Sequence, residues 1–155
     1  LGPVGRLDKS SEGLLLLSND TIWAAGITDP ATHLDKTYHV QVAGQPDAAV
    51  LAAMLAGVED AGDRLKARKA TLLRVGEKNA WLEVVLDEGR NRHIRRLLSA
   101  LGFDVLRLIR VAIGPLVLGE LAKGQWRRLD HDEVRSLTTS PQEPARGRCS
   151  CIPES

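Results

Sequence analysis

The order of the expected elements predicts an α+β fold with a mixed, mostly antiparallel sheet flanked by helices. One observation behind this prediction is that segments with a strand-like apolar pattern are mixed with segments of helical pattern along the 155 residues. The other is that short turn sequences, Gly76-Glu77-Lys78 and Gly114-Pro115, follow strand-like segments. Strands joined by such short turns are antiparallel, because a parallel pair needs a long crossover connection.

The N-terminal part of the chain contains a loop, a strand and a helix in that order. A glycine-rich polar loop over residues 2–13 leads into Leu14–Leu17, a continuous apolar run that predicts a buried strand. Residues 18–20 can cap a short helix over 21–27. Asp29-Pro30 ends that helix, because the residue before proline avoids the α region.

The middle of the chain continues with a half-buried strand over 36–42, in which Tyr38, Val40 and Val42 share one face. Gln45-Pro46-Asp47 then opens a helix through Ala56. Further strands are expected over 65–75, 79–86, 104–111 and 124–129. Residues 116–119 are expected to turn back after Gly114-Pro115, and a closing helix is expected over 130–137.

Between two of these strands lies an unusual helix that is rich in arginine. Asn91 can cap its start, and Gly102 stands where a left-handed residue would end it. Its apolar face consists of Ile94, Leu97, Leu98 and Leu101. Its polar side carries Arg92, Arg95 and Arg96, which project together because they are three and four residues apart. We expect a carboxylate, a phosphate or both to offset their mutual repulsion.

The charge of the chain is small in sum but unevenly placed. The net charge is +1, which excludes a generic polycation, whereas residues 88–110 carry six arginines against Glu88 and Asp104, a local balance of +4. Such a focused basic patch suits a phosphate-bearing partner, although a solvated charged face explains the charges alone equally well. Aromatic residues make up only 3% of the chain, which argues against a base-stacking platform for single-stranded RNA.

Composition indicates one domain over residues 1–137 and a disordered tail over 138–155, which is rich in proline and charge. Cys149 and Cys151 are the only cysteines, so no disulfide framework is expected, as in a reducing compartment. No run of apolar residues is long enough to span a bilayer, and no signal peptide is visible. The four histidines lack metal-ligand spacing, so we expect no metal site and assign each histidine to the surface or to a loop.

Two residues outside the arginine helix could take part in chemistry. Asp8, in the loop Gly5-Arg6-Leu7-Asp8 before a buried strand, could be held at the edge of a cleft, although a turn aspartate that bonds local N–H groups is the more common case. Tyr38 is the only tyrosine, and a core position is its ordinary interpretation. An arginine facing a buried aspartate would keep the carboxylate ionised.

Four motifs together resemble the pseudouridine synthases, and more narrowly the RsuA-like family that modifies bacterial ribosomal RNA. The first is Gly5-Arg6-Leu7-Asp8 with Glu12-Gly13 and the leucines after it, which resembles the catalytic-aspartate segment. Lys36-Thr37-Tyr38 is similar to the lysine-x-tyrosine segment, and residues 88–97 are similar to the arginine-rich start of a helix. Residues 107–116 are similar to the C-terminal strand and turn.

The resemblance implies isomerisation of a uridine to pseudouridine by a catalytic domain of the pseudouridine synthase type. It implies Asp8 as the nucleophile, Tyr38 as the active-site tyrosine and Arg95 as the basic partner of Asp8, within hydrogen-bond reach of it. No metal, organic or nucleotide cofactor is implied, because the carboxylate supplies the covalent chemistry. The resemblance implies ribosomal RNA as the partner and no association with a membrane. The protein would be a monomer in the cytoplasm. The candidate RNA-binding residues are Arg6, Lys36, Arg90, Arg92, Arg96, Arg107 and Arg110.

Two features depart from the family pattern. His93 stands where the family usually has glutamine, and the family normally has sequence before the aspartate motif, so we expect the chain to lack its first strands. A non-catalytic RNA- or ribosome-binding module, in which Asp8 is structural, therefore stays open as an alternative. A metal-dependent nuclease is disfavoured, because no carboxylates cluster in a motif. The residues do not decide between direct attack on the ribose and a glycal intermediate.

Overall fold

The computed structural model describes residues 2–5, 7, 11–28, 34–86 and 93–137. In the described part, the chain divides into two compact units. The central unit consists of residues 37–109, and the terminal unit combines the described residues of 1–36 with those from 110 onward. The boundaries fall inside strands β4 (Lys36–Ala43) and β9 (Val105–Ile113).

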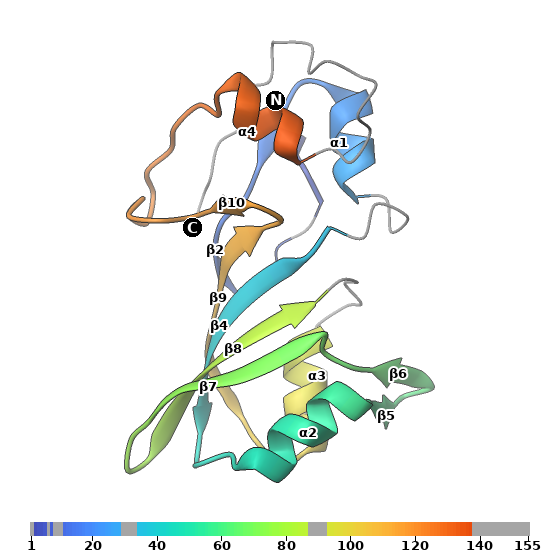
Figure 1. Ribbon diagram of the computed structural model, residues 1–155, viewed down its shortest axis with the longest axis vertical. Coiled ribbons are helices and arrows are strands. Elements are labelled where there is room, and N and C mark those ends of the chain that lie inside the picture. The colour runs from blue at the N-terminus through green and yellow to red at the C-terminus, as the bar shows by residue number, and fades with distance from the viewer. Residues whose placement is uncertain (1, 6, 8–10, 29–33, 87–92, 138–155) are drawn as a thin grey trace. The chain divides into compact units, whose positions relative to one another are not determined.

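Among the described residues the main sheet has six strands, consistent with the predicted α+β class. The order is β10-β9-β4-β8-β7, and β2 also pairs with β9 (Figure 1). Besides β4 and β9 these strands are β2 (Glu12–Gly13), β7 (Lys69–Val75), β8 (Asn79–Leu86) and β10 (Leu116–Val117). β7 pairs antiparallel with β8, which confirms the predicted hairpin, and β10 pairs antiparallel with β9, which confirms that the chain turns back after Gly114-Pro115.

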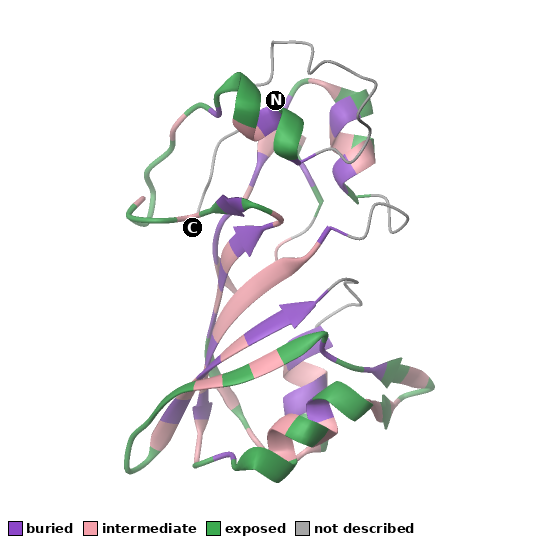
Figure 2. Cartoon of the chain, viewed as in Figure 1, coloured by how far each residue is buried: buried purple, intermediate pink, exposed green. Residues whose placement is uncertain are grey.

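The core of the central unit lies between strands and two helices. Alternate residues of β4 and β8, among them Val40, Val42, Leu82 and Val84, are fully buried (Figure 2). Helices α2 (Ala48–Ala56) and α3 (His93–Ala100) contribute buried apolar residues to the same core. The Asp47 side chain accepts a hydrogen bond from the Val50 backbone and caps α2, at the position where the sequence predicts the helix to open.

A small hairpin in the central unit was not predicted. It consists of β5 (Val58–Asp60) and β6 (Asp63–Leu65), joined by Ala61 and Gly62. Both turn residues have positive φ angles, 49° and 85°, which is the conformation of a tight two-residue hairpin turn. Its strands are short and charged and show no apolar alternation, so the apolar pattern did not reveal them. The predicted strand over 65–75 accordingly begins later, at Lys69.

The terminal unit has its own core, which includes Leu14, Leu16 and residues of two helices. Helix α1 (Thr21–Thr28) contributes Trp23, whose Nε1 donates a 3.1 Å hydrogen bond to the Val134 backbone in α4 (His131–Ser136). β1 (Gly2–Pro3) pairs antiparallel with β3 (Leu17–Ser18).

Leu14–Leu17 is buried or half-buried, as expected, but only Leu17 belongs to a strand. The backbone N–H of Leu14 bonds to Arg110, whereas the carbonyl of Leu16 bonds to Val4. The partner therefore changes within the run, and no continuous ladder forms.

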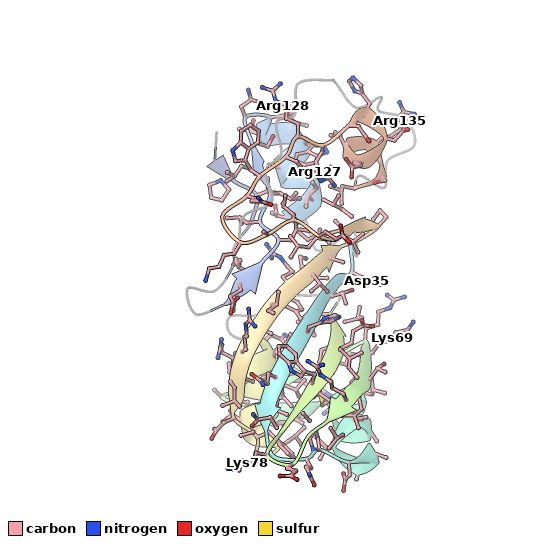
Figure 3. All side chains as sticks on the ribbon, turned by 90° about the vertical axis from the view of Figure 1, so that its left-hand side faces the viewer. Asp35, Lys69, Lys78, Arg127, Arg128 and Arg135 are labelled. Atoms are coloured by element: carbon pink, nitrogen blue, oxygen red, sulfur yellow. The ribbon has the colours of Figure 1, made fainter. Side chains whose placement is uncertain are left out.

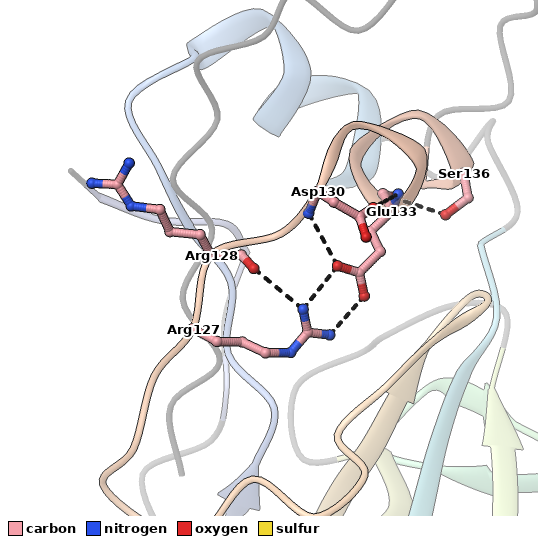
Figure 4. Close-up of polar contacts among 5 residues, drawn as sticks. All are labelled: Arg127, Arg128, Asp130, Glu133 and Ser136. Carbon is pink, nitrogen blue, oxygen red and sulfur yellow. Dashed lines mark hydrogen bonds and ion pairs between the residues drawn. The ribbon is translucent and has the colours of Figure 1, made fainter.

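The predicted strand over 124–129 is wrong, because these residues form an irregular segment. Local bonds replace a strand ladder there: the Gln125 side chain accepts from the Ala122 backbone at 3.1 Å. Arg127 instead forms a bidentate pair with Glu133 of α4, at 2.8 and 2.6 Å (Figure 4). Glu133 also completes a capping box with Asp130, and its bonds from Arg127 lower its pKa below the ordinary value.

Candidate active site

Helix α3 has the apolar face and the C-terminal residue that the sequence predicts. Ile94, Leu97 and Leu98 are buried in the core of the central unit, whereas Arg95 and Arg96 of the same helix are half-buried. Gly102 has a φ of 90°, and the next backbone N–H, of Phe103, bonds to Leu98 at 2.9 Å. The predicted cap residue, Asn91, lies outside the described residues.

His93, the first residue of α3, is buried rather than placed on the surface or in a loop, so that expectation is wrong for this histidine. Its Nε2 lies 2.9 Å from the backbone oxygen of Lys66. A carbonyl oxygen only accepts, so Nε2 carries a proton and donates it. The bond fastens the start of the arginine helix to the segment that precedes β7.

Arg96 contacts two carboxylates of the β5–β6 hairpin. Its Nε donates to Asp60 at 2.7 Å, and its Nη2 donates to Asp63 at 2.9 Å and to the Asp60 backbone oxygen at 2.9 Å. The hydrogen bonds that Arg96 donates to Asp60, and then to Asp63, raise the pKa of Arg96 above its usual value. For this arginine, the negative charge expected to offset the arginine cluster is thus supplied by the protein itself.

These contacts predict that Arg96→Ala lowers the melting temperature of the chain. The variant would leave Asp60 and Asp63 close together without the guanidinium that bridges them, and would release the hairpin from α3. The measurement is a circular-dichroism melt. Arg64→Ala is the matched control on the same hairpin. Arg64 contacts Glu59 at 3.5 Å and the Ala56 carbonyl at 2.8 Å, and both contacts are exposed, so we expect a smaller decrease. Equal melting temperatures of Arg96→Ala and the unmodified chain would contradict a structural role for Arg96.

The other candidate residues of the central unit differ in exposure. Arg95 is half-buried on α3, and its Nε atom is buried. Tyr38, on β4, is half-buried and packs against the central core, the ordinary position expected for it. Arg107, on β9, is exposed. The central unit thus holds the candidate tyrosine and arginine on elements that share one core.

The terminal unit contains Lys36, which is half-buried, and Arg110, which is 2% exposed. Arg110 Nε donates to the backbone oxygen of Leu14 at 2.8 Å, so this guanidinium is hydrogen-bonded inside the unit. The remaining candidates, Arg6, Asp8, Arg90 and Arg92, lie outside the described residues, as do the Asp29-Pro30 helix end and the predicted tail.

The segment that contains Asp8 is anchored on both sides. On the N-terminal side, Val4 donates its backbone N–H to Leu16 at 2.8 Å, and on the other side Leu14 donates to Arg110 at 2.8 Å. Gly13, between these anchors, has a φ of 109° and lies against the Arg110 backbone.

The described residues contain no group of three or more histidine, cysteine, aspartate or glutamate side chains placed to hold a metal ion. None of the helices in the described ranges has the length and apolar composition needed to cross a membrane.

Known proteins resemble this chain in sequence and in structure. Residues 1–100 match the RNA pseudouridylate synthase family model. The chain is 44% identical over 146 residues to the ribosomal large subunit pseudouridine synthase E of Xanthomonas campestris, covering 84% of this chain and 78% of that protein. It is 42% identical over 135 residues to an uncharacterized RNA pseudouridine synthase of Aquifex aeolicus, covering 87% of this chain. A crystal structure of a pseudouridylate synthase matches with a TM-score of 0.76 and 35% identity, covering 88% of this chain and 59% of that one.

The chain therefore belongs to the RNA pseudouridine synthase family, which confirms the resemblance of its motifs. The chain spans only 54% of the Aquifex relative and 58% of a ribosomal large subunit pseudouridine synthase E from Vibrio parahaemolyticus, to which it is 37% identical.

The two carboxylates that hold Arg96 were not predicted from the sequence. Asp60 and Asp63 flank the two-residue turn of the β5–β6 hairpin. An Asp-x-Gly-Asp sequence is a turn signal, and it could have revealed the hairpin. Its pairing with α3, more than 30 residues away, has no local signal.

Proposed function

We propose that this chain isomerises a uridine of ribosomal RNA to pseudouridine, and that the RNA is that of the large subunit. The observation that carries the proposal is the family match over residues 1–100, which contain Asp8, Tyr38 and Arg95. The choice of the large subunit is supported by relatives named ribosomal large subunit pseudouridine synthase E, one of which is 44% identical.

In this reaction the bond between the ribose and N1 of the uracil breaks, the base rotates, and a bond from the ribose to C5 forms. C5 then loses its proton and N1 gains one, so that the product is an isomer of the substrate. Asp8 supplies the carboxylate, either by attack on the ribose or by assisting a glycal intermediate. Arg95 is the cationic partner that keeps this carboxylate ionised. The target uridine must leave its stack, and Tyr38 stacks on the flipped base and takes part in proton transfer. No cofactor is required for these steps.

The remaining cations bind RNA phosphates, which position the RNA without reading its sequence. Arg107 is exposed on β9 and suits this role, and Arg6, Lys36, Arg90 and Arg92 are further candidates. Arg96 and Arg110 are less suited, because the first is paired with two carboxylates and the second is buried. We propose that the protein acts in the cytoplasm, where its RNA substrate is made, and that it acts as a monomer.

The test is formation of pseudouridine by the purified chain on unmodified large-subunit ribosomal RNA transcribed in vitro. The modified position is mapped by chemical labelling and primer extension, with small-subunit ribosomal RNA as the control substrate. A single modified uridine in the large-subunit RNA would support the proposal. RNA binding without modification of either RNA would contradict it and favour a non-catalytic RNA-binding module.

A further inference from the structure

A second group of cations lies apart from the arginine helix. Residues 64–78 contain six lysines and arginines and a single acidic residue, Glu77. We name five of these cations the β7 strip, because they lie on β7 or on its two flanks. The β7 strip consists of Lys66, Arg68, Lys69, Arg74 and Lys78.

All five side chains of the β7 strip are exposed. β7 is the last strand in the order of the main sheet, so the strip follows an outer edge. Figure 3 shows Lys69 at one end of β7 and Lys78 at the hairpin tip beyond its other end. A strand of seven residues is about 23 Å long at roughly 3.3 Å per residue, so the strip can follow several nucleotides.

Hydrogen bonds from other residues of the central unit hold the tip of the β7–β8 hairpin in place. The backbone N–H of Gly44 donates to the Lys78 carbonyl at 2.7 Å, and the Gln45 side chain donates to the Gly76 carbonyl at 2.8 Å. Arg74 is opposite Trp81 in the register of β7 and β8, and its guanidinium lies 6.0 Å from the centre of the indole ring. These contacts fix the backbone that carries the charges, which reduces the entropy lost on binding.

The other end of the β7 strip meets the arginine helix. The carbonyl of Lys66 accepts the hydrogen bond from His93, the first residue of α3, at 2.9 Å. The strip therefore begins beside the helix that carries Arg95 and extends away from it along β7 to Lys78. A nucleic-acid strand bound near the start of α3 would therefore meet Lys66, Arg68 and Lys69 first, and Arg74 and Lys78 further along the strip.

We propose that the β7 strip binds phosphates of the ribosomal RNA on one side of the target uridine, which extends the RNA-binding surface beyond the arginine helix. This inference rests on the proposed function for the identity of the RNA. Lysines on an edge strand also prevent sheets from pairing edge to edge, which is the competing explanation for these charges. The number of cations, their exposure and their continuity with α3 favour RNA.

The double variant Lys69→Gln/Lys78→Gln tests this proposal, because it removes two charges and leaves the Arg74–Trp81 contact in place. The matched control is Lys123→Gln/Arg128→Gln, which removes two exposed charges of the terminal unit. Binding of unmodified large-subunit ribosomal RNA by the full 155-residue chain is measured as a function of salt concentration. Each lost phosphate contact lowers the slope of log K against log salt by about 0.7–0.9, so we expect a decrease of about 1.4–1.8.

A slope for Lys69→Gln/Lys78→Gln that equals that of the unmodified chain or of the control would overturn the proposal. Self-association of the variant in sedimentation experiments, with an unchanged slope, would also overturn it and would assign the lysines to edge protection. Pseudouridine formation by the unmodified chain is assayed on the same RNA. If the slope of the double variant decreases but the unmodified chain forms no pseudouridine, the proposal for the β7 strip stands and the proposed function is refuted. If the unmodified chain forms pseudouridine but the slope of the double variant is unchanged, only the proposal for the β7 strip is refuted.

Discussion

Asp8→Asn is expected to reduce pseudouridine formation to background while the chain stays folded and still binds ribosomal RNA. Asparagine has nearly the same size and keeps most hydrogen bonds, but it lacks the negative charge and the nucleophilic oxygen. Loss of a catalytic nucleophile typically costs several orders of magnitude in rate, and we expect a decrease of at least about 10³-fold. RNA binding should persist, because the phosphate contacts come from cations elsewhere in the chain.

The measurement compares pseudouridine formation with a circular-dichroism melt of the same preparation. Asp20→Asn is the matched control, because it removes one negative charge from the same terminal unit. The Asp20 side chain caps α1 by accepting from the backbone of Trp23 at 3.0 Å, and asparagine is an equally good cap. Asp20→Asn should therefore retain activity. A folded Asp8→Asn variant that forms pseudouridine at the unmodified rate would end the assignment of Asp8 as nucleophile.

The elements that could be predicted from the sequence are those with a strong local signal. Helix α3 has apolar residues at helical spacing and a glycine after its end, and both features are present in the structure. The hairpin of β7 and β8 follows from two apolar segments around Gly76-Glu77-Lys78. In each case, neighbouring residues determine the backbone conformation, so periodicity and turn chemistry are sufficient.

The elements that were missed depend on contacts between distant residues. The segment 124–129 was predicted as a strand, but Arg127 pairs with Glu133 and Gln125 bonds within a local turn. The same difference between local signals and distant contacts applies to the candidate site. Charge patterning predicted that negative groups would balance the arginine helix, whereas the choice of Asp60 and Asp63 as partners of Arg96 depends on how the chain folds back.

Gly13→Ala is expected to be the most destabilising single methyl addition among the described glycines. Gly13 has a φ of 109°, a left-handed conformation that costs a residue with a side chain about 1–3 kcal/mol. A Cβ atom there would lie 2.2 Å from the Arg110 oxygen and 2.6 Å from the Arg110 nitrogen. Both are backbone atoms of β9, so the overlap is relieved only if β2 and β9 move apart. Overpacking of this kind adds about 1–3 kcal/mol.

The same movement would disturb the anchor of the Asp8 segment. The Leu14 N–H donates to the Arg110 carbonyl, and Arg110 Nε donates to the Leu14 carbonyl, each at 2.8 Å. Separating β2 from β9 breaks both bonds and leaves the buried guanidinium of Arg110 without this acceptor. We therefore expect Gly13→Ala to lose pseudouridine formation even at temperatures at which the remaining structure stays folded.

Denaturant unfolding of Gly13→Ala and of Gly26→Ala measures this effect against a matched substitution. Gly26 lies in α1 of the same unit, and a Cβ added there would meet no atom within 4 Å. Alanine at Gly26 should stabilise the helix by roughly 0.5–1 kcal/mol, whereas alanine at Gly13 should lower the free energy of unfolding by about 2–6 kcal/mol. If the two variants unfold at the same denaturant concentration, Gly13 does not hold β2 against β9, and the anchor of the Asp8 segment must lie elsewhere.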